Sequence, residues 1–147
     1  ASALPEPLRS FFRAHSPVLL SVGLLEAEYD LPLQIAALGE IRRRHPDAGL
    51  VMIGSGSLDA RLKGLASETA WRDHLLLTGD VDRDAVLLAI ARCDVLLRTT
   101  LYDGDAISVR EALHLGTPVI ASDNGMRPPG TRLLPRNDKD DLAFAVD

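Results

Sequence analysis

Two carboxylates on one short segment are the side chains of this sequence best suited to hold a ligand. Asp103 follows an apolar run, and Glu111 comes eight residues later, inside a stretch with helical spacing. Asp105 is placed to cap that helix through its own side chain, whereas Asp103 lies too far before the helix for that role. A carboxylate at the mouth of a site accepts two hydroxyl hydrogen bonds at once, which suits a sugar.

Glu111 is expected one turn into this helix, stacked on Ile107 and Leu115 on a partly buried face. A glutamate among apolar neighbours needs a hydrogen-bonding partner, such as a ribose diol. The alternative is a surface glutamate paired with Arg110 or with a lysine. The free N–H groups and the positive dipole end at the start of the helix would suit a phosphate or sugar oxygen.

The rest of the chain supplies elements that can position these groups. Short apolar runs predict buried strands at 17–23, 48–56, 74–79, 94–100, 118–122 and 132–135. Amphipathic stretches predict helices at 8–15, 30–46, 57–70, 82–93, 106–115 and 138–147, with Asp30 and Ser57 as caps. Strands that are apolar on both faces and alternate with helices predict an α/β fold: a doubly wound, Rossmann-like parallel sheet of about six strands with helices on both faces.

Ligands of such sheets bind beyond the carboxyl ends of the strands, where the strand order reverses. The segments that follow the strands are Gly23–Leu24, Gly54–Gly56, Gly79–Val81, Arg98–Gly104 and Ser122–Arg127. Gly54-Ser55-Gly56 resembles part of a dinucleotide fingerprint, but Asp59 stands at its third glycine position. It is either a tight turn where two backbones come close or a place that leaves room for a ligand.

Composition and charge exclude several classes of protein. A chain of 147 residues is the size of one domain with one core, and a net charge of −5 disfavours a grip on nucleic acid. The longest basic block, Arg42–Arg44, is read as a solvated face, with a lipid or polyanion contact as the alternative. A single cysteine, Cys93, excludes an internal disulfide and is expected to be a small buried side chain. The four histidines show no metal-ligand spacing, so no metal site is expected.

No signal peptide is evident, and no apolar run approaches the ~18 residues of a membrane span, so a cytoplasmic location is expected. The chain lacks a starting Met and ends inside an expected helix. We therefore expect residues 1–147 to be a single domain taken from a longer protein.

The stretch DVLLRTTLYDGDAISVREALHLGTPVIASD, residues 94–123, resembles the donor-binding domain of GT-B retaining glycosyltransferases of family 4, the group 1 class. That family carries two acidic residues separated by seven, usually both Glu, and the corresponding pair here is Asp103 and Glu111. EALHLGTPVIASD closely matches the family's stretch after the second acid. The resemblance continues in SVGLL (21–25), HPDAGLVMIGSGSL (45–58), LLLTGDV (75–81) and DLAFAV (141–146).

The resemblance implies a role for each part of the strand edge. The donor sugar would lie against Asp103, Gly104, Asp105, Ala106 and Ile107, and the ribose against Glu111. The phosphates would face Gly23 and Ser108, with Arg98 and Arg127 as candidate phosphate contacts where the sequence departs from the family. The base would lie near Gly54, Gly79, Asp80 and Val81, with Gly54 also lining the cleft near the diphosphate. No catalytic nucleophile is assigned.

The implied substrate is a UDP- or GDP-linked sugar, and no cofactor or metal is implied. A hexose would pass, with retention of configuration, to a glycan or lipid-linked acceptor held by a missing N-terminal domain. This domain alone would be an inactive part of a hexosyltransferase. The full-length protein would be cytoplasmic or peripheral at the inner face of the membrane.

The sequence departs from the family where the diphosphate is neutralised. The family usually has Arg directly after the glycine of the first strand and Lys five residues later, but Leu24 and Tyr29 stand here. Two cations facing a diphosphate would stabilise the transition state in a closed site. Arg98 and Arg127 are candidate replacements, and a surface loop position is the alternative for Arg127. The first acid is also shortened from Glu to Asp, and the family's usual aromatic after Gly104 is missing.

These departures keep a second hypothesis open, a non-catalytic nucleotide-sugar-binding or scaffold module that has lost its diphosphate-binding cations. A third, a dinucleotide oxidoreductase domain, is disfavoured by the incomplete glycine fingerprint.

Overall fold

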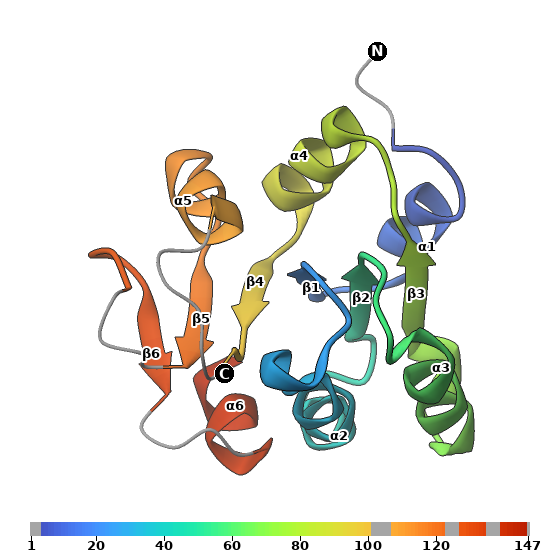
Figure 1. The fold of residues 1–147 in the computed structure, drawn as a ribbon. Coiled ribbons are helices and arrows are strands. Elements are labelled where there is room, and N and C mark those ends of the chain that lie inside the picture. The colour runs from blue at the N-terminus through green and yellow to red at the C-terminus, as the bar shows by residue number, and fades with distance from the viewer. Residues whose placement is uncertain (1–3, 101–106, 123–126, 135–138, 147) are drawn as a thin grey trace.

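The computed structural model describes residues 4–100, 107–122, 127–134 and 139–146 (Figure 1). The strands are β1 (Val18–Val22), β2 (Gly49–Ile53), β3 (Leu75–Gly79), β4 (Val95–Arg98), β5 (Val119–Ser122) and β6 (Arg132–Leu134). The helices are α1 (Leu8–Ala14), α2 (Leu31–Ile41), α3 (Asp59–Glu68), α4 (Arg83–Arg92), α5 (Ile107–His114) and α6 (Lys139–Val146), with single 3-10 turns η1 (Ala27–Tyr29) and η2 (Arg72–His74).

The six strands form one parallel sheet in the order β3-β2-β1-β4-β5-β6. The chain builds outward from β1 to β3, then returns to the middle and continues from β4 to β6 on the other side (Figure 1). The predicted doubly wound, Rossmann-like fold is confirmed. The strand order reverses between β1 and β4, and this is where ligands of such sheets bind.

Helices cover both faces of the sheet (Figure 1), and a cluster of buried apolar residues lies between the sheet and the helices on each face. Helices α2, α3 and α6 pack over one face, where Leu19 of β1 contributes, and α1, α4 and α5 pack over the other, where Leu20 contributes. Neighbouring residues of a strand point to opposite faces, so covering both faces requires apolar residues throughout. A fully buried leucine stabilises the fold by about 1.5–3 kcal/mol relative to an exposed one.

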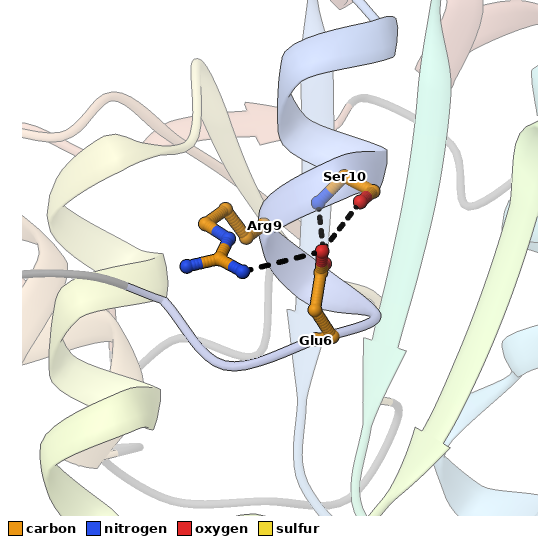
Figure 2. Close-up of polar contacts among 3 residues, drawn as sticks. All are labelled: Glu6, Arg9 and Ser10. Atoms are coloured by element: carbon orange, nitrogen blue, oxygen red, sulfur yellow. Dashed lines mark hydrogen bonds and ion pairs between the residues drawn. The ribbon is translucent and has the colours of Figure 1, made fainter.

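The carboxylate of Glu6 closes the first turn of α1 (Figure 2). Its oxygens accept the backbone N–H of Ser10 at 2.9 Å and the Ser10 hydroxyl at 2.7 Å, and Arg9 Nη2 lies 3.5 Å away. The hydrogen bonds from Ser10 lower the pKa of Glu6. The helix closed in this way buries Leu8 against the face of the sheet that carries Leu20.

Every expected strand and helix is present, and most of them are shorter than expected by one to a few residues at their ends. Asp30 stands before α2 as expected, but at φ 49° its side chain makes no capping hydrogen bond to the helix. Pro32 lies in the first turn, and the helix ends at Ile41, where a turn over residues 42–44 begins. Asp82, which had no predicted role, caps α4 by accepting the backbone N–H of Ala85 at 2.8 Å.

The prediction that Ser57 caps α3 is wrong, because Leu58 occupies the position before the helix. The backbone N–H of Ser57 instead donates to Glu26 Oε2 at 3.0 Å, and its hydroxyl donates to Glu26 Oε1. A carboxylate is a stronger acceptor than a hydroxyl, so Ser57 acts as a donor to the loop after β1. These hydrogen bonds lower the pKa of Glu26.

Cys93 ends α4 as a buried side chain, as expected, and burial raises the pKa of its thiol to about 12. Over the described ranges, no helix has the length and apolar character needed to cross a membrane. Within the same ranges, no cluster of three or more His, Cys, Asp or Glu side chains could hold a metal ion.

Candidate functional site

A cavity of about 260 Å³ opens at the carboxyl edge of the sheet, over the point where the strand order reverses. The ends of β1, β2, β3 and β4 and the loops after them line it. The lining residues are Val22, Gly23, Leu24, Tyr29, Ile53, Gly54, Ser55, Asp80, Val81, Val86 and Arg98. The cavity therefore brings together Gly23, Gly54, Asp80, Val81 and Arg98 from four separate predicted segments.

Two glycine turns form the floor of the cavity. The N–H of Gly23 donates to the carbonyl of Ile53 at 3.1 Å, and the N–H of Gly54 donates to the carbonyl of Gly79 at 3.0 Å. Gly54 has φ 139°, and a side chain there would collide with the carbonyl oxygen of Gly23. The tight turn where two backbones come close is thus present, and Gly54 also faces the cavity.

The loops that follow β1 and β2 are joined beyond these glycines. Leu25 N–H donates to the Ser55 carbonyl at 3.0 Å, and Leu58 N–H donates to the Leu25 carbonyl at 3.0 Å. The hydrogen bonds from Ser57 to Glu26 extend the same connection. Backbone and side-chain hydrogen bonds thus both join the two loops beside the cavity.

Arg98 brings a positive charge into the cavity from the end of β4. Its Nη1 donates to the carbonyl of Val22 at 2.9 Å, and its guanidinium carbon lies 4.7 Å from the centre of the Tyr29 ring. A Cβ on Gly23 would lie 2.8 Å from Nη1 and 2.9 Å from the Tyr29 ring. Glycine at this position therefore leaves the space that the stacked pair occupies.

A buried polar chain fixes the backbone on which Tyr29 stands. The Thr99 hydroxyl donates to the Tyr29 carbonyl at 2.8 Å and accepts from Gln34 Nε2 at 3.0 Å. Gln34 and Thr99 are each 1% exposed. Thr99 follows Arg98 directly, so β4 anchors both partners of the stack.

The base end of the predicted site carries one further polar contact. Ser55 Oγ donates to Asp80 Oδ2 at 2.9 Å, which joins the loops after β2 and β3. Asp80 is exposed at the rim and Val81 is half-buried beside it, while Gly79 has φ 73°. All three lie at the end of β3, where sequence reasoning placed them.

Glu111 is paired with a residue that sequence reasoning did not select. Arg83 Nη2 donates to Glu111 Oε2 at 2.7 Å; the Arg83 side chain is 71% exposed and that of Glu111 is 18% exposed. The alternative drawn from the sequence was a pair with Arg110 or a lysine, whereas this ion pair joins α5 to α4 through Arg83. Ile107 and Leu115, expected to give Glu111 a partly buried apolar face, are 71% and 44% exposed. The buried face of α5 consists of Ser108, Val109 and Ala112.

Arg127 lies at the end of β5. Its Nε donates to the Ser122 carbonyl at 3.0 Å and its Nη2 to the Ser122 hydroxyl at 3.3 Å. The same hydroxyl donates to the Thr100 carbonyl, so Arg127 is tied to the residues that follow β4. Arg127 is not among the residues that line the cavity described above.

Four residues of the predicted donor-sugar site, Asp103, Gly104, Asp105 and Ala106, lie outside the described residues. Ile107 and Ser108 begin α5 next to them. The Ser108 hydroxyl is buried and has no hydrogen-bond partner among the described residues.

Two residues of the site, Arg83 and Tyr29, were not predicted from the sequence. Arg83 could have been found from the order of the sheet, because α4 and α5 are neighbouring crossovers on one face. Tyr29 was noted only as a departure from the family, although an aromatic ring near a strand-end arginine is a possible cation–π partner.

Comparison with known proteins identifies the family. The sequence matches the glycosyl transferases group 1 over residues 8–129, and the chain belongs to this family. An uncharacterized glycosyltransferase of Methanocaldococcus jannaschii is 29% identical over 137 residues, which cover 88% of this chain and 35% of that protein. A GDP-mannose-dependent alpha-(1-6)-phosphatidylinositol monomannoside mannosyltransferase of Mycobacterium tuberculosis is 34% identical over 129 residues, covering 82% of this chain and 34% of that protein.

Solved structures share the fold at low sequence identity. The C-terminal domain of a glycosyl transferase group 1 family protein from Francisella tularensis has a TM-score of 0.78 at 16% identity, over 99% of this chain and 83% of that one. An Anabaena protein in complex with UDP and glucose has a TM-score of 0.74 at 16% identity, over 92% of this chain and 38% of that one. The chain spans about a third of the length of the curated relatives described above.

Proposed function

We propose that this chain is the C-terminal, nucleotide-sugar-binding domain of a retaining glycosyltransferase of family 4. The observation that carries the proposal is the cavity over the strand-order reversal, where two glycine turns and the cation of Arg98 meet. A diphosphate needs backbone that can be approached closely and positive charge nearby, and this cavity supplies both. The named activities of the relatives support the transferase class.

The roles proposed for individual residues follow the carboxyl edge of the sheet. The base would lie beside Gly79, Asp80 and Val81, and the ribose hydroxyls would donate to Glu111. The phosphates would lie between the glycine turns and the start of α5. The donor sugar, a hexose, would contact the segment from Asp103 to Ile107.

The transfer itself would take place in the full-length protein. An acceptor domain outside residues 1–147 would hold a glycan or lipid-linked acceptor on the inner side of the membrane. The share of the relatives' length that this chain spans supports such a division. The isolated domain would bind the donor and transfer nothing.

A titration series tests the proposal. UDP, GDP, UDP-glucose and GDP-mannose are titrated into the chain by calorimetry, beside Glu111→Ala and Asp103→Ala. We expect one nucleotide to bind, Glu111→Ala to weaken it about tenfold by removing a charged acceptor, and Asp103→Ala to remove only the sugar-dependent part. Glu68→Ala, an exposed glutamate at the end of α3, is the control and should change nothing. No binding at millimolar nucleotide would contradict the proposal.

The alternative, a non-catalytic module, is favoured by Leu24, which is 56% exposed where the family has its arginine. It is tested in the full-length protein by sugar transfer from the nucleotide sugar that binds. Binding without transfer or donor hydrolysis would favour the module.

A further inference from the structure

Arg98 has an aromatic partner in the cavity, Tyr29, which also packs against the apolar core on one face of the sheet. Tyr29 stands where the family usually has lysine, and it contributes an aromatic face in place of a charge. That face lies under the guanidinium of Arg98 at 4.7 Å. Both side chains line the cavity at the strand-order reversal.

We propose that Tyr29 and Arg98 together form the anion-binding element of this site, with Arg98 as the ligand and Tyr29 as its positioning residue. The inference rests on the proposed function, because it assumes that a nucleoside diphosphate occupies the cavity. It goes further by assigning the diphosphate contact to one stacked pair from β4 and η1. The family carries its positive charge in the loop after β1. In this chain Arg98 would supply that charge from the end of β4, on the other side of the strand-order reversal.

A hydrogen bond and a ring contact position the guanidinium, and each limits a different freedom. Nη1 donates a hydrogen bond to the Val22 carbonyl, which fixes the direction of that arm of the guanidinium. The Tyr29 ring holds the guanidinium plane by a cation–π contact. The missing Cβ of Gly23 leaves space for both groups, since a Cβ there would lie 2.8 Å from Nη1.

A buried hydrogen-bond network holds the backbone of Tyr29. The carbonyl of Tyr29 accepts a hydrogen bond from Thr99, which accepts one from Gln34, and both of these side chains are buried. An arginine held by a carbonyl, a ring and a buried network loses little additional side-chain entropy when an anion binds. A planar fork also binds phosphate oxygens in pairs, which an ammonium group does not.

Arg98→Gln tests the ligand role. We expect it to weaken a nucleoside diphosphate and inorganic pyrophosphate by about 10- to 100-fold and to leave the parent nucleoside unchanged. Arg98→Lys keeps the charge without the fork and should recover part of the affinity. Arg61→Gln, which removes an exposed arginine of α3, is the matched control and should leave all three ligands unchanged.

Variants of Tyr29 test the positioning role. Tyr29→Phe keeps the ring and should bind the nucleoside diphosphate like the original chain. Tyr29→Leu removes the ring and should weaken the diphosphate about 3- to 10-fold, with nucleoside affinity unchanged. A purely structural role would instead lower nucleoside and diphosphate affinity together.

The outcomes separate this inference from the proposed function. If the original chain binds a nucleoside diphosphate and Arg98→Gln binds it equally well, the inference is overturned and the donor-binding role stands. Equal binding by Tyr29→Leu would overturn the positioning role of Tyr29. If the original chain binds no nucleoside diphosphate, both proposals fail.

Discussion

At the scale of single residues, the ion pair between Arg83 and Glu111 orients a carboxylate that could accept hydrogen bonds from a hydroxyl ligand. Arg83 occupies Glu111 Oε2 at 2.7 Å, and no other described residue contacts Oε1. The arginine fixes the direction of the carboxylate and leaves one oxygen as an acceptor. Because Arg83 is 71% exposed, the pair should add less than about 1 kcal/mol to the free energy of unfolding.

Arg83→Ala should therefore affect binding more than stability. If Glu111 holds the ribose, we expect affinity for the nucleoside diphosphate to fall several-fold, about 1 kcal/mol, while affinity for its 2′,3′-dideoxy analogue stays the same. Calorimetric titration of both ligands checks this. An equal loss for both analogues would show that Arg83 acts through the fold or contacts another part of the ligand.

Two glycines give a matched test of backbone approach. Gly54→Ala would drive a methyl group into the Gly23 carbonyl at φ 139°, and we expect it to lower the free energy of unfolding by about 2–4 kcal/mol. Gly64→Ala adds the same methyl group in open space within α3 and should stabilise by about 0.5–1 kcal/mol. Urea unfolding measures both, and a tolerated Gly54→Ala would contradict the close approach of the two turns.

At the scale of elements, two histidines join the end of α1 to the turn before β3. His15 Nδ1 lies 2.9 Å from the Phe11 carbonyl, and its Nε2 lies 3.0 Å from His74 Nδ1. The carbonyl requires a proton on His15 Nδ1, so in the neutral pair His74 donates to His15 Nε2. Burial, the charge of Arg42 and the neighbouring His15 lower the pKa of His74, and Asp73 and Asp47 oppose this shift.

The lowered pKa of His74 determines how the free energy of unfolding should change with pH. A histidine whose pKa is lower in the folded chain binds its proton more readily when unfolded, so stability is complete above about pH 6.5 and falls as the pH drops below it. We expect His74→Gln to flatten this fall between about pH 7 and pH 5. His114→Gln, an exposed position at the end of α5, is the control. Urea unfolding at a series of pH values measures the slopes, and equal slopes for both variants would rule out the histidine contact.

The elements were predictable from the sequence because each depends on local pattern, whereas contacts between elements depend on sheet order. The run of apolar residues in β1 and the proline in the first turn of α2 indicated the elements that they belong to. Ser57 was misassigned because its acceptor, Glu26, is a neighbour only in the folded chain. The Arg83–Glu111 pair likewise requires α4 beside α5, a placement that no single segment encodes.

At the scale of the whole molecule, the cavity connects the two halves of the sheet. Strands β1, β2 and β3 supply the glycine turns, and β4 supplies Arg98. A ligand seated there contacts segments that are otherwise joined through the β1–β4 pairing, which the structure records over two residue pairs. Nucleotide binding should therefore stabilise the domain as one unit.

This coupling has a measurable size. A nucleoside diphosphate at 100 times its dissociation constant should raise the free energy of unfolding by about 2.7 kcal/mol, because only the folded chain binds it. Amide hydrogen exchange should slow in the same experiment at Gly23 and Gly54, and also in β5, which contributes no residue to the cavity lining but pairs with Arg98 through Ala121. Arg98→Gln at the same nucleotide concentration should show a smaller increase in both measurements. Protection confined to the glycine turns would mean that the two halves of the sheet open independently, and that the ligand stabilises only the half formed by β1, β2 and β3.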